Sequence, residues 1–141
     1  MTHRTSALLI CIYYRVAAHD SSRVISAVRE FQRTLLQSTG ATEAQVLLRC
    51  DLPSPLSLAA PPDDRPASLH SHEPPAGRDA RVDPGADATV METYRLSLPP
   101  AGGPQADAAV RDFLSSLESA SAPLAGLLRG ARHVELFAPC A

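Results

Sequence analysis

Residues 6–16 read Ser-Ala-Leu-Leu-Ile-Cys-Ile-Tyr-Tyr-Arg-Val and form the longest apolar run in the chain. β-Branched and aromatic residues of this kind suit a pleated, buried strand. Successive strand side chains point to opposite faces, so the run divides into two sets. One set is almost wholly apolar and consists of Leu8, Ile10, Ile12, Tyr14 and Val16. The other set becomes polar toward its end and consists of Leu9, Cys11, Tyr13 and Arg15. We therefore predict a central strand with helices packed on its apolar face.

Two amphipathic helices are predicted on either side of the middle of the chain. The first, at about residues 22–39, has apolar side chains at spacings of four, three and four. These side chains are Val24, Val28, Phe31 and Leu35. The second helix begins near Pro104, a residue that the first turn tolerates, and ends before Pro123. Its apolar stripe consists of Val110, Phe113, Leu114 and Leu117.

Three more strands are predicted, at residues 45–51, 89–96 and 132–137. The first two of these are separated by a segment rich in Pro, Ala, Ser, Asp and Gly, with no apolar periodicity. Repeated prolines forbid a central strand or a long helix there, so we predict a disordered insertion at about residues 54–86.

The resulting order is strand, helix, strand, strand, helix, strand. This βαββαβ order predicts a single α+β domain over residues 1–141 with the ferredoxin-like fold. In that fold four antiparallel strands lie in the order 4-1-3-2 and both helices cover one face. The most apolar strand, at residues 6–16, then takes a central position.

The open face of the predicted sheet is where a site would have to lie. With Met91, Thr93, Val134 and Leu136 assigned to the helix side, the open face mixes aromatic and charged side chains. The candidate ligand-binding residues are Tyr13, Arg15, Glu92, Tyr94, His133 and Glu135. This set depends on the third strand, because a one-residue slip in register would turn Glu92 and Tyr94 inward.

Two interpretations of this face remain open. In the first, a homodimer binds a small, partly aromatic or acidic molecule there, and His133 acts as acid/base or hydrogen-bond partner, oriented by Glu92 or Glu135. In the second, the charged residues are cross-strand ion pairs in a dimer interface, and the protein is a non-catalytic assembly or accessory module. The sequence leaves the catalytic residues, and whether the protein is an enzyme, undecided.

Composition narrows the classes of partner. The net charge is -2 and the pI is about 6.2, which gives no reason to expect binding to nucleic acid or to an anionic membrane. The apolar run at residues 6–16 is too short to span a bilayer, so we expect a cytoplasmic protein. Three cysteines without a Cys-x-x-Cys spacing do not indicate a metal site, and His70 and His72 fall in the flexible insertion. No phosphate-binding or other cofactor motif is present, so we expect no cofactor.

Three short segments carry a family resemblance: Ile-Tyr-Tyr-Arg-Val at 12–16, Val-Met-Glu-Thr-Tyr at 90–94 and Arg-His-Val-Glu-Leu-Phe at 132–137. In this order they resemble the uncharacterised bacterial domain of unknown function 4936 family. The resemblance implies a small α+β domain similar to dimeric α/β-barrel proteins. Those proteins include cofactor-free monooxygenases, isomerase-like and haem-handling enzymes, and members that only bind. The family has no known activity, so the resemblance assigns no catalytic residue.

Overall fold

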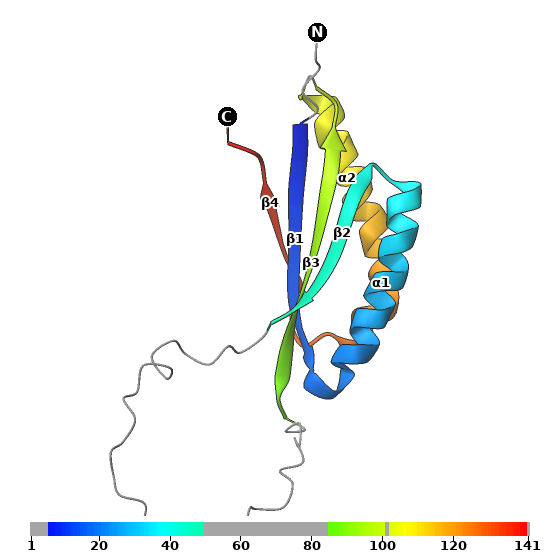
Figure 1. Cartoon of the computed structure of the whole chain (residues 1–141), viewed down its shortest axis with the longest axis vertical. Coiled ribbons are helices and arrows are strands. Elements are labelled where there is room, and N and C mark those ends of the chain that lie inside the picture. Colours follow the sequence, from blue (N-terminus) through cyan, green and yellow to red (C-terminus); the bar gives the residue numbers. More distant parts are fainter. Residues whose placement is uncertain (1–5, 50–84, 101, 141) are drawn as a thin grey trace, which may run out of the picture.

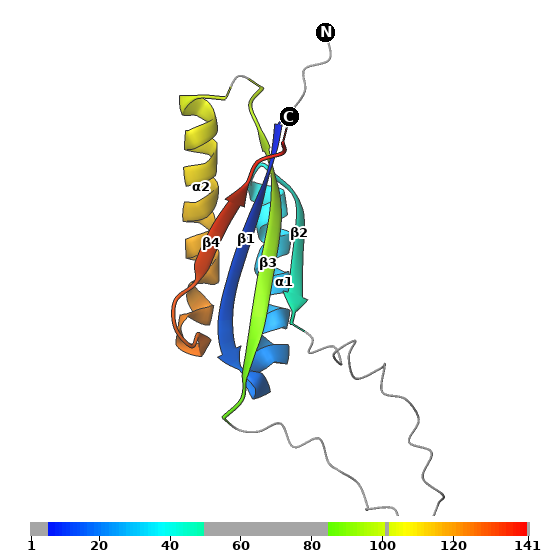
Figure 2. The ribbon, with the colours of Figure 1, turned by 90° about the vertical axis from the view of Figure 1, so that its left-hand side faces the viewer.

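Four antiparallel strands form a single sheet in the computed structural model, which describes residues 6–49, 85–100 and 102–140. They are β1 (Ser6–Ala17), β2 (Ala41–Leu48), β3 (Asp87–Leu98) and β4 (His133–Phe137). Their order is β2-β3-β1-β4, as Figure 2 shows, and this confirms the predicted order 4-1-3-2. Nearly all of the insertion predicted at residues 54–86, together with His70 and His72, lies outside the described residues.

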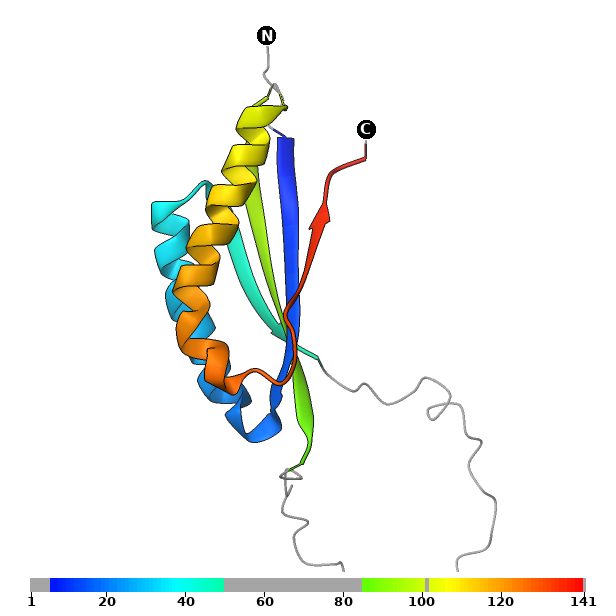
Figure 3. The ribbon, with the colours of Figure 1, turned by 180° about the vertical axis from the view of Figure 1, so that it is seen from behind.

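Both long helices cover the same face of the sheet (Figures 1 and 3). They are α1 (Ser21–Ser38) and α2 (Pro104–Ser121). Short 3-10 helices, η1 (Ala18–Asp20) and η2 (Ala122–Leu127), precede α1 and follow α2. The βαββαβ order with two helices on one side is the ferredoxin-like fold, as the sequence predicts.

The hydrophobic core lies between the sheet and the two helices. Its centre is the apolar set of β1, in which Ile10, Ile12, Tyr14 and Val16 are almost completely buried. The predicted stripe of α1 faces this set, and its four apolar residues are all buried. Phe113 and Leu117 of α2 are buried on the same side. The periodicity of β1 and of both helices therefore predicted correctly which of their side chains form the core.

The faces predicted for β3 are wrong by one residue. In the register of β1 with β3, Ile10 lies opposite Tyr94 and Ile12 lies opposite Glu92. Residues directly opposite each other in an antiparallel pair share a face, so Tyr94 and Glu92 point toward the helices. Both are completely buried. Met91 and Thr93, which were predicted to face the helices, share the open face with Tyr13 and Cys11, their partners in the register.

The open face carries large apolar side chains among its charged ones. Leu9 of β1, Leu47 of β2 and Phe137 of β4 are 36%, 44% and 48% exposed, respectively. A cross-strand ion pair joins Arg95 of β3 to Glu43 of β2 on the same face, with Nε 3.3 Å from Oε2. This face of the isolated chain is therefore neither a hydrophobic core nor an ordinary solvated surface.

Candidate functional site

Three of the predicted site residues lie together on the open face. Tyr13 of β1 lies opposite His133 of β4, and their rings stack with centroids 5.0 Å apart and an interplanar angle of 16°. The Tyr13 hydroxyl donates a hydrogen bond to Oε1 of Glu135 at 3.3 Å. The negative charge of Glu135 is the main cause of a raised pKa of the Tyr13 phenol. Tyr13 therefore stays a neutral hydrogen-bond donor at physiological pH.

Arg15 lies near the end of β1 and forms part of a second charged group. Its Nη1 is 3.7 Å from Oδ2 of Asp87, at the start of β3. The other carboxylate oxygen of Asp87 accepts a hydrogen bond from Nη1 of Arg129 at 3.0 Å. Arg129 is brought there by its backbone, because its N–H donates to the carbonyl oxygen of Arg15 at 2.8 Å. Two arginines from distant parts of the chain thus share a single aspartate.

A pocket of about 370 Å³ opens beside these groups. It is lined by Tyr13, Tyr14, Arg15, Arg49, Thr89, Arg129, Gly130, Ala131 and His133. We call it the arginine pocket. Its walls combine guanidinium groups with the stacked Tyr13 and His133 rings, so it offers positive charge next to a flat aromatic surface. The chain turns here at Gly130, which has a φ of 93°. This conformation is unfavourable for any residue that has a Cβ atom.

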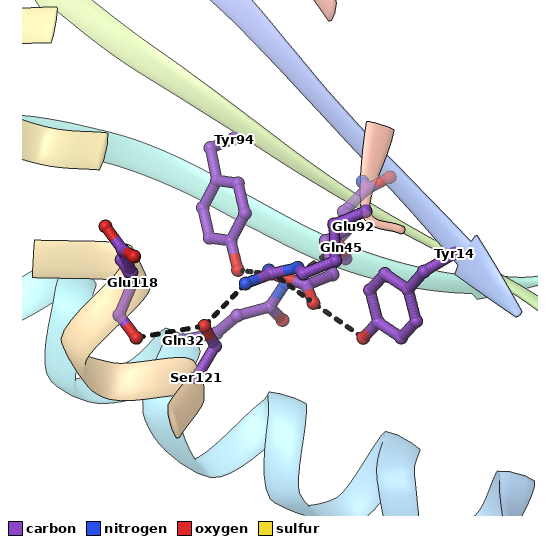
Figure 4. A network of polar contacts seen from close by, with 8 residues as sticks. Tyr14, Gln32, Gln45, Glu92, Tyr94, Glu118 and Ser121 are labelled. Carbon is purple, nitrogen blue, oxygen red and sulfur yellow. Dashed lines mark hydrogen bonds and ion pairs between the residues drawn. The ribbon is translucent and has the colours of Figure 1, made fainter. Parts of the chain in front are cut away.

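A second polar cluster is buried on the other side of the sheet, between the strands and the helices (Figure 4). The Glu92 carboxylate lies at its centre and is completely buried. The hydroxyl of Tyr14 donates to Glu92 Oε1 at 2.6 Å, and the hydroxyl of Tyr94 donates to Oε2 at 2.5 Å. Each oxygen of this buried carboxylate therefore accepts a short hydrogen bond from a tyrosine, as burial of a charge requires.

Arg132 supplies the positive charge of this buried cluster. Its Nη2 is 3.4 Å from Glu92 Oε1, and its Nη1 donates to the Ser121 hydroxyl at 2.5 Å. The guanidinium also lies over the ring of Tyr14, 5.4 Å from the centroid. Arg132 Nε is a buried donor for which the described residues supply no hydrogen-bond partner. The next residue along the chain is His133, which lies on the open face, so two consecutive residues contribute to the two sides of the sheet.

Burial and Glu92 act together on the two buried tyrosines. Desolvation, followed by the charge of Glu92, raises the pKa of Tyr14 and of Tyr94 far above the usual value. Both side chains therefore remain phenols that donate to the carboxylate. The two tyrosine hydroxyls and Arg132 Nη2 all donate to this one carboxylate, which holds Arg132 and the tyrosines in place.

The six predicted site residues are thus divided between the two faces of the sheet. Tyr13, Arg15, His133 and Glu135 lie on the open face, whereas Glu92 and Tyr94 belong to the interior cluster. Glu92 cannot orient His133 directly, and Glu135 contacts Tyr13. Sequence reasoning missed Arg129 and Asp87, which join the site only through the tertiary fold. For Glu92 a signal did exist, because it shares its parity along β3 with the apolar residues Val90 and Leu96.

Among the described residues, no three His, Cys, Asp or Glu side chains come close enough together to hold a metal ion. Within the same residues, no helix is long and apolar enough to cross a membrane.

Comparisons with known proteins bear on the fold. No family model matches the chain, and no curated protein matches it significantly. Solved structures do match. A protein described as a "Putative antibiotic biosynthesis monooxygenase" from Nitrosomonas europaea is 9% identical with a TM-score of 0.53, over 96% of this chain and 92% of that one. A dimeric ferredoxin-like protein of unknown function from Thermobifida fusca is 13% identical with a TM-score of 0.50, over 96% of this chain and 93% of that one. At such identities these similarities support the ferredoxin-like fold alone.

Proposed function

We propose that this protein is a homodimer that associates through its open sheet face and binds a small molecule in the arginine pocket. The observation that carries the proposal is the pocket itself. Its volume of about 370 Å³ is in the range of small-molecule sites. Three of the residues that line it, Tyr13, Arg15 and His133, are ones that the sequence singles out.

The dimer is supported by the apolar residues of the open face. Leu9, Leu47 and Phe137 lie on three different strands and are each more than a third exposed. Apolar surface of this kind, rimmed by charges, is typical of protein interfaces. The structurally similar protein from Thermobifida fusca is itself described as dimeric. A second copy of this chain is therefore the occupant that we propose for this face.

We propose binding in preference to catalysis. A catalytic histidine is usually oriented by a hydrogen-bonded carboxylate. Here Glu92 lies across the sheet from His133, and Glu135 accepts its hydrogen bond from Tyr13. His133 is positioned instead by stacking on Tyr13, an arrangement suited to contacting a bound ring.

The exposed leucines and Phe137 also favour the second interpretation, an assembly module whose open face is only a dimer interface. The two interpretations differ in the arginine pocket. In the first, Tyr13→Ala and His133→Ala each remove a ring from the pocket wall, so they leave the dimer and its thermal stability intact and abolish retention of a small molecule. In the second, both substitutions weaken the dimer and nothing is retained.

Native mass spectrometry of the protein purified from its own host tests both parts of the proposal. It measures subunit number and any retained small molecule in the same spectrum. We expect a dimer that dissociates when Leu47 and Phe137 are both replaced by Asp. Leu36→Asp is the matched control, because Leu36 is 37% exposed but lies on α1, away from the open face. A dimer that survives the double substitution would rule out the open face as the interface.

Membership of the domain of unknown function 4936 family and a cytoplasmic location are also proposals. The family assignment is supported by the three strand segments that carry the resemblance. Fractionation of the native host, with the protein detected by antibody, tests the location.

A further inference from the structure

We infer that the ligand of the arginine pocket is a planar organic anion, an aromatic carboxylate. This inference rests on the proposed function, because it assigns a chemical class to the molecule bound in that same pocket. Two separate features of the pocket carry it: its excess of positive charge and its aromatic wall.

The charge follows from the way Asp87 is shared. Arg15 and Arg129 both line the pocket, and both pair with this one carboxylate. Arg129 makes a hydrogen bond to it at 3.0 Å, whereas Arg15 approaches no closer than 3.7 Å, which is too far for a hydrogen bond. Two guanidinium groups thus face one carboxylate, so a net positive charge remains. A ligand carboxylate would accept hydrogen bonds from the Arg15 fork in the geometry that arginine favours.

The aromatic wall gives the second half of the ligand. The Tyr13 and His133 rings stack nearly parallel, with an interplanar angle of 16°, and both line the pocket. A flat ring adjacent to the carboxylate can pack on this pair, and aromatic pairs of this kind add stabilisation beyond their buried area. The pocket volume of about 370 Å³ limits the ligand to a small molecule.

The probes are benzoate, its neutral isostere benzamide, and inorganic phosphate, which carries charge without a ring. Binding to the full-length protein is measured by calorimetry and by NMR of the Tyr13 and His133 ring protons. We expect benzoate to bind at least about 10-fold more tightly than benzamide, because a charge-assisted pair with arginine is lost in the amide. We also expect benzoate to bind more tightly than phosphate and to shift both ring signals.

Substitutions in the charged group give results of opposite sign. Arg15→Gln and Arg129→Gln each remove a positive charge, so each should weaken benzoate binding by about 10-fold. Asp87→Asn removes the competing carboxylate and should strengthen it severalfold. If these three residues only supported the structure of the pocket, all three substitutions, including Asp87→Asn, would weaken benzoate binding. Arg29→Gln, on the exposed side of α1, should leave the affinity unchanged.

Distinct outcomes overturn the inference and the proposed function. Equal affinities for benzoate and benzamide, with both rings shifted, would overturn the anionic class and leave the small-molecule site in place. Phosphate binding as tightly as benzoate would overturn the aromatic part of the ligand. Weaker benzoate binding by Asp87→Asn would overturn the charge argument. No binding of any probe overturns the inference, and if native mass spectrometry also finds no retained molecule, the proposed site fails with it.

Discussion

Replacing Arg132 by Met should destabilise the protein far more than breaking an exposed ion pair of similar length. Arg132→Met keeps much of the side-chain volume but leaves the completely buried Glu92 without a cation. Removing one partner of a buried ion pair costs roughly 3–5 kcal/mol. Here Arg132 is 21% exposed and its Nη2 is 3.4 Å from Glu92 Oε1, so we expect a smaller cost of about 2–3 kcal/mol.

The chain contains a matched control for this substitution. Arg95 and Glu43 form an ion pair of 3.3 Å, but their side chains are 51% and 64% exposed. Solvent screens such a pair, so Arg95→Met should lower the free energy of unfolding by no more than about 0.5 kcal/mol. The two pairs have nearly the same length, and the comparison therefore isolates the effect of burial.

The assay is urea unfolding followed by circular dichroism at pH 7 and one fixed protein concentration, since the stability of the proposed dimer would depend on concentration. Wild type, Arg132→Met, Glu92→Gln and the double variant form a double-mutant cycle. We expect a coupling energy between Arg132 and Glu92 of about 2 kcal/mol, and a fall in Tm of roughly 10 °C or more for Arg132→Met. A coupling energy below about 0.5 kcal/mol, or equal losses for Arg132→Met and Arg95→Met, would refute the reasoning.

Three further predictions concern the tyrosines, the core and the pocket loop. Burial raises the folded-state pKa of Tyr14 and Tyr94 above the unfolded value of 10.0, so their contribution to stability is fully present below pH 10 and is lost above it, by up to about 1.4 kcal/mol per pH unit for each tyrosine. Urea unfolding between pH 8 and 11 measures this loss. Tyr14→Phe should reduce the slope, and a free energy of unfolding that does not change with pH would contradict the prediction. Phe113→Ala should cost about 3–5 kcal/mol in the same assay, because the ring is buried against Tyr94 at a centroid distance of 5.2 Å, and a loss below 1 kcal/mol would show that the helices do not depend on it. Gly130→Ala should cost about 1–2 kcal/mol because of its φ of 93° and not because of crowding, since a Cβ there would meet nothing within 4 Å; an unchanged Tm would show that the turn relaxes freely.

The fold was predictable because its periodic signals are strong and local. The α1 stripe repeats over the length of the helix, and β1 alternates cleanly between apolar and mixed side chains. The face of β3 was harder to predict, since both of its parity sets contain polar residues. Glu92 was predicted on the open face because Met91 and Thr93 were assigned to the helix side, and the true faces are shifted by one residue. Its burial depends on partners that are distant in sequence, such as Tyr14, 78 residues away.

The candidate site was predictable only in part, for the same physical reason. Tyr13, His133 and Glu135 follow from strand alternation, which needs only local pattern and strand order. The meeting of Arg15, Asp87 and Arg129 depends on how the chain after η2 returns to β1. No periodicity encodes that return, so of the charged group only Arg15 was predicted from the sequence, and its pairing with Asp87 and Arg129 was not.

The pairing of Glu92 with Arg132 has a consequence for how this protein can change over evolutionary time. Loss of either residue leaves the other with an unpaired charge in a largely buried position, which is destabilising. A lineage that loses one of them should therefore soon lose the other. An apolar residue at position 92 should therefore occur together with a non-basic residue at position 132.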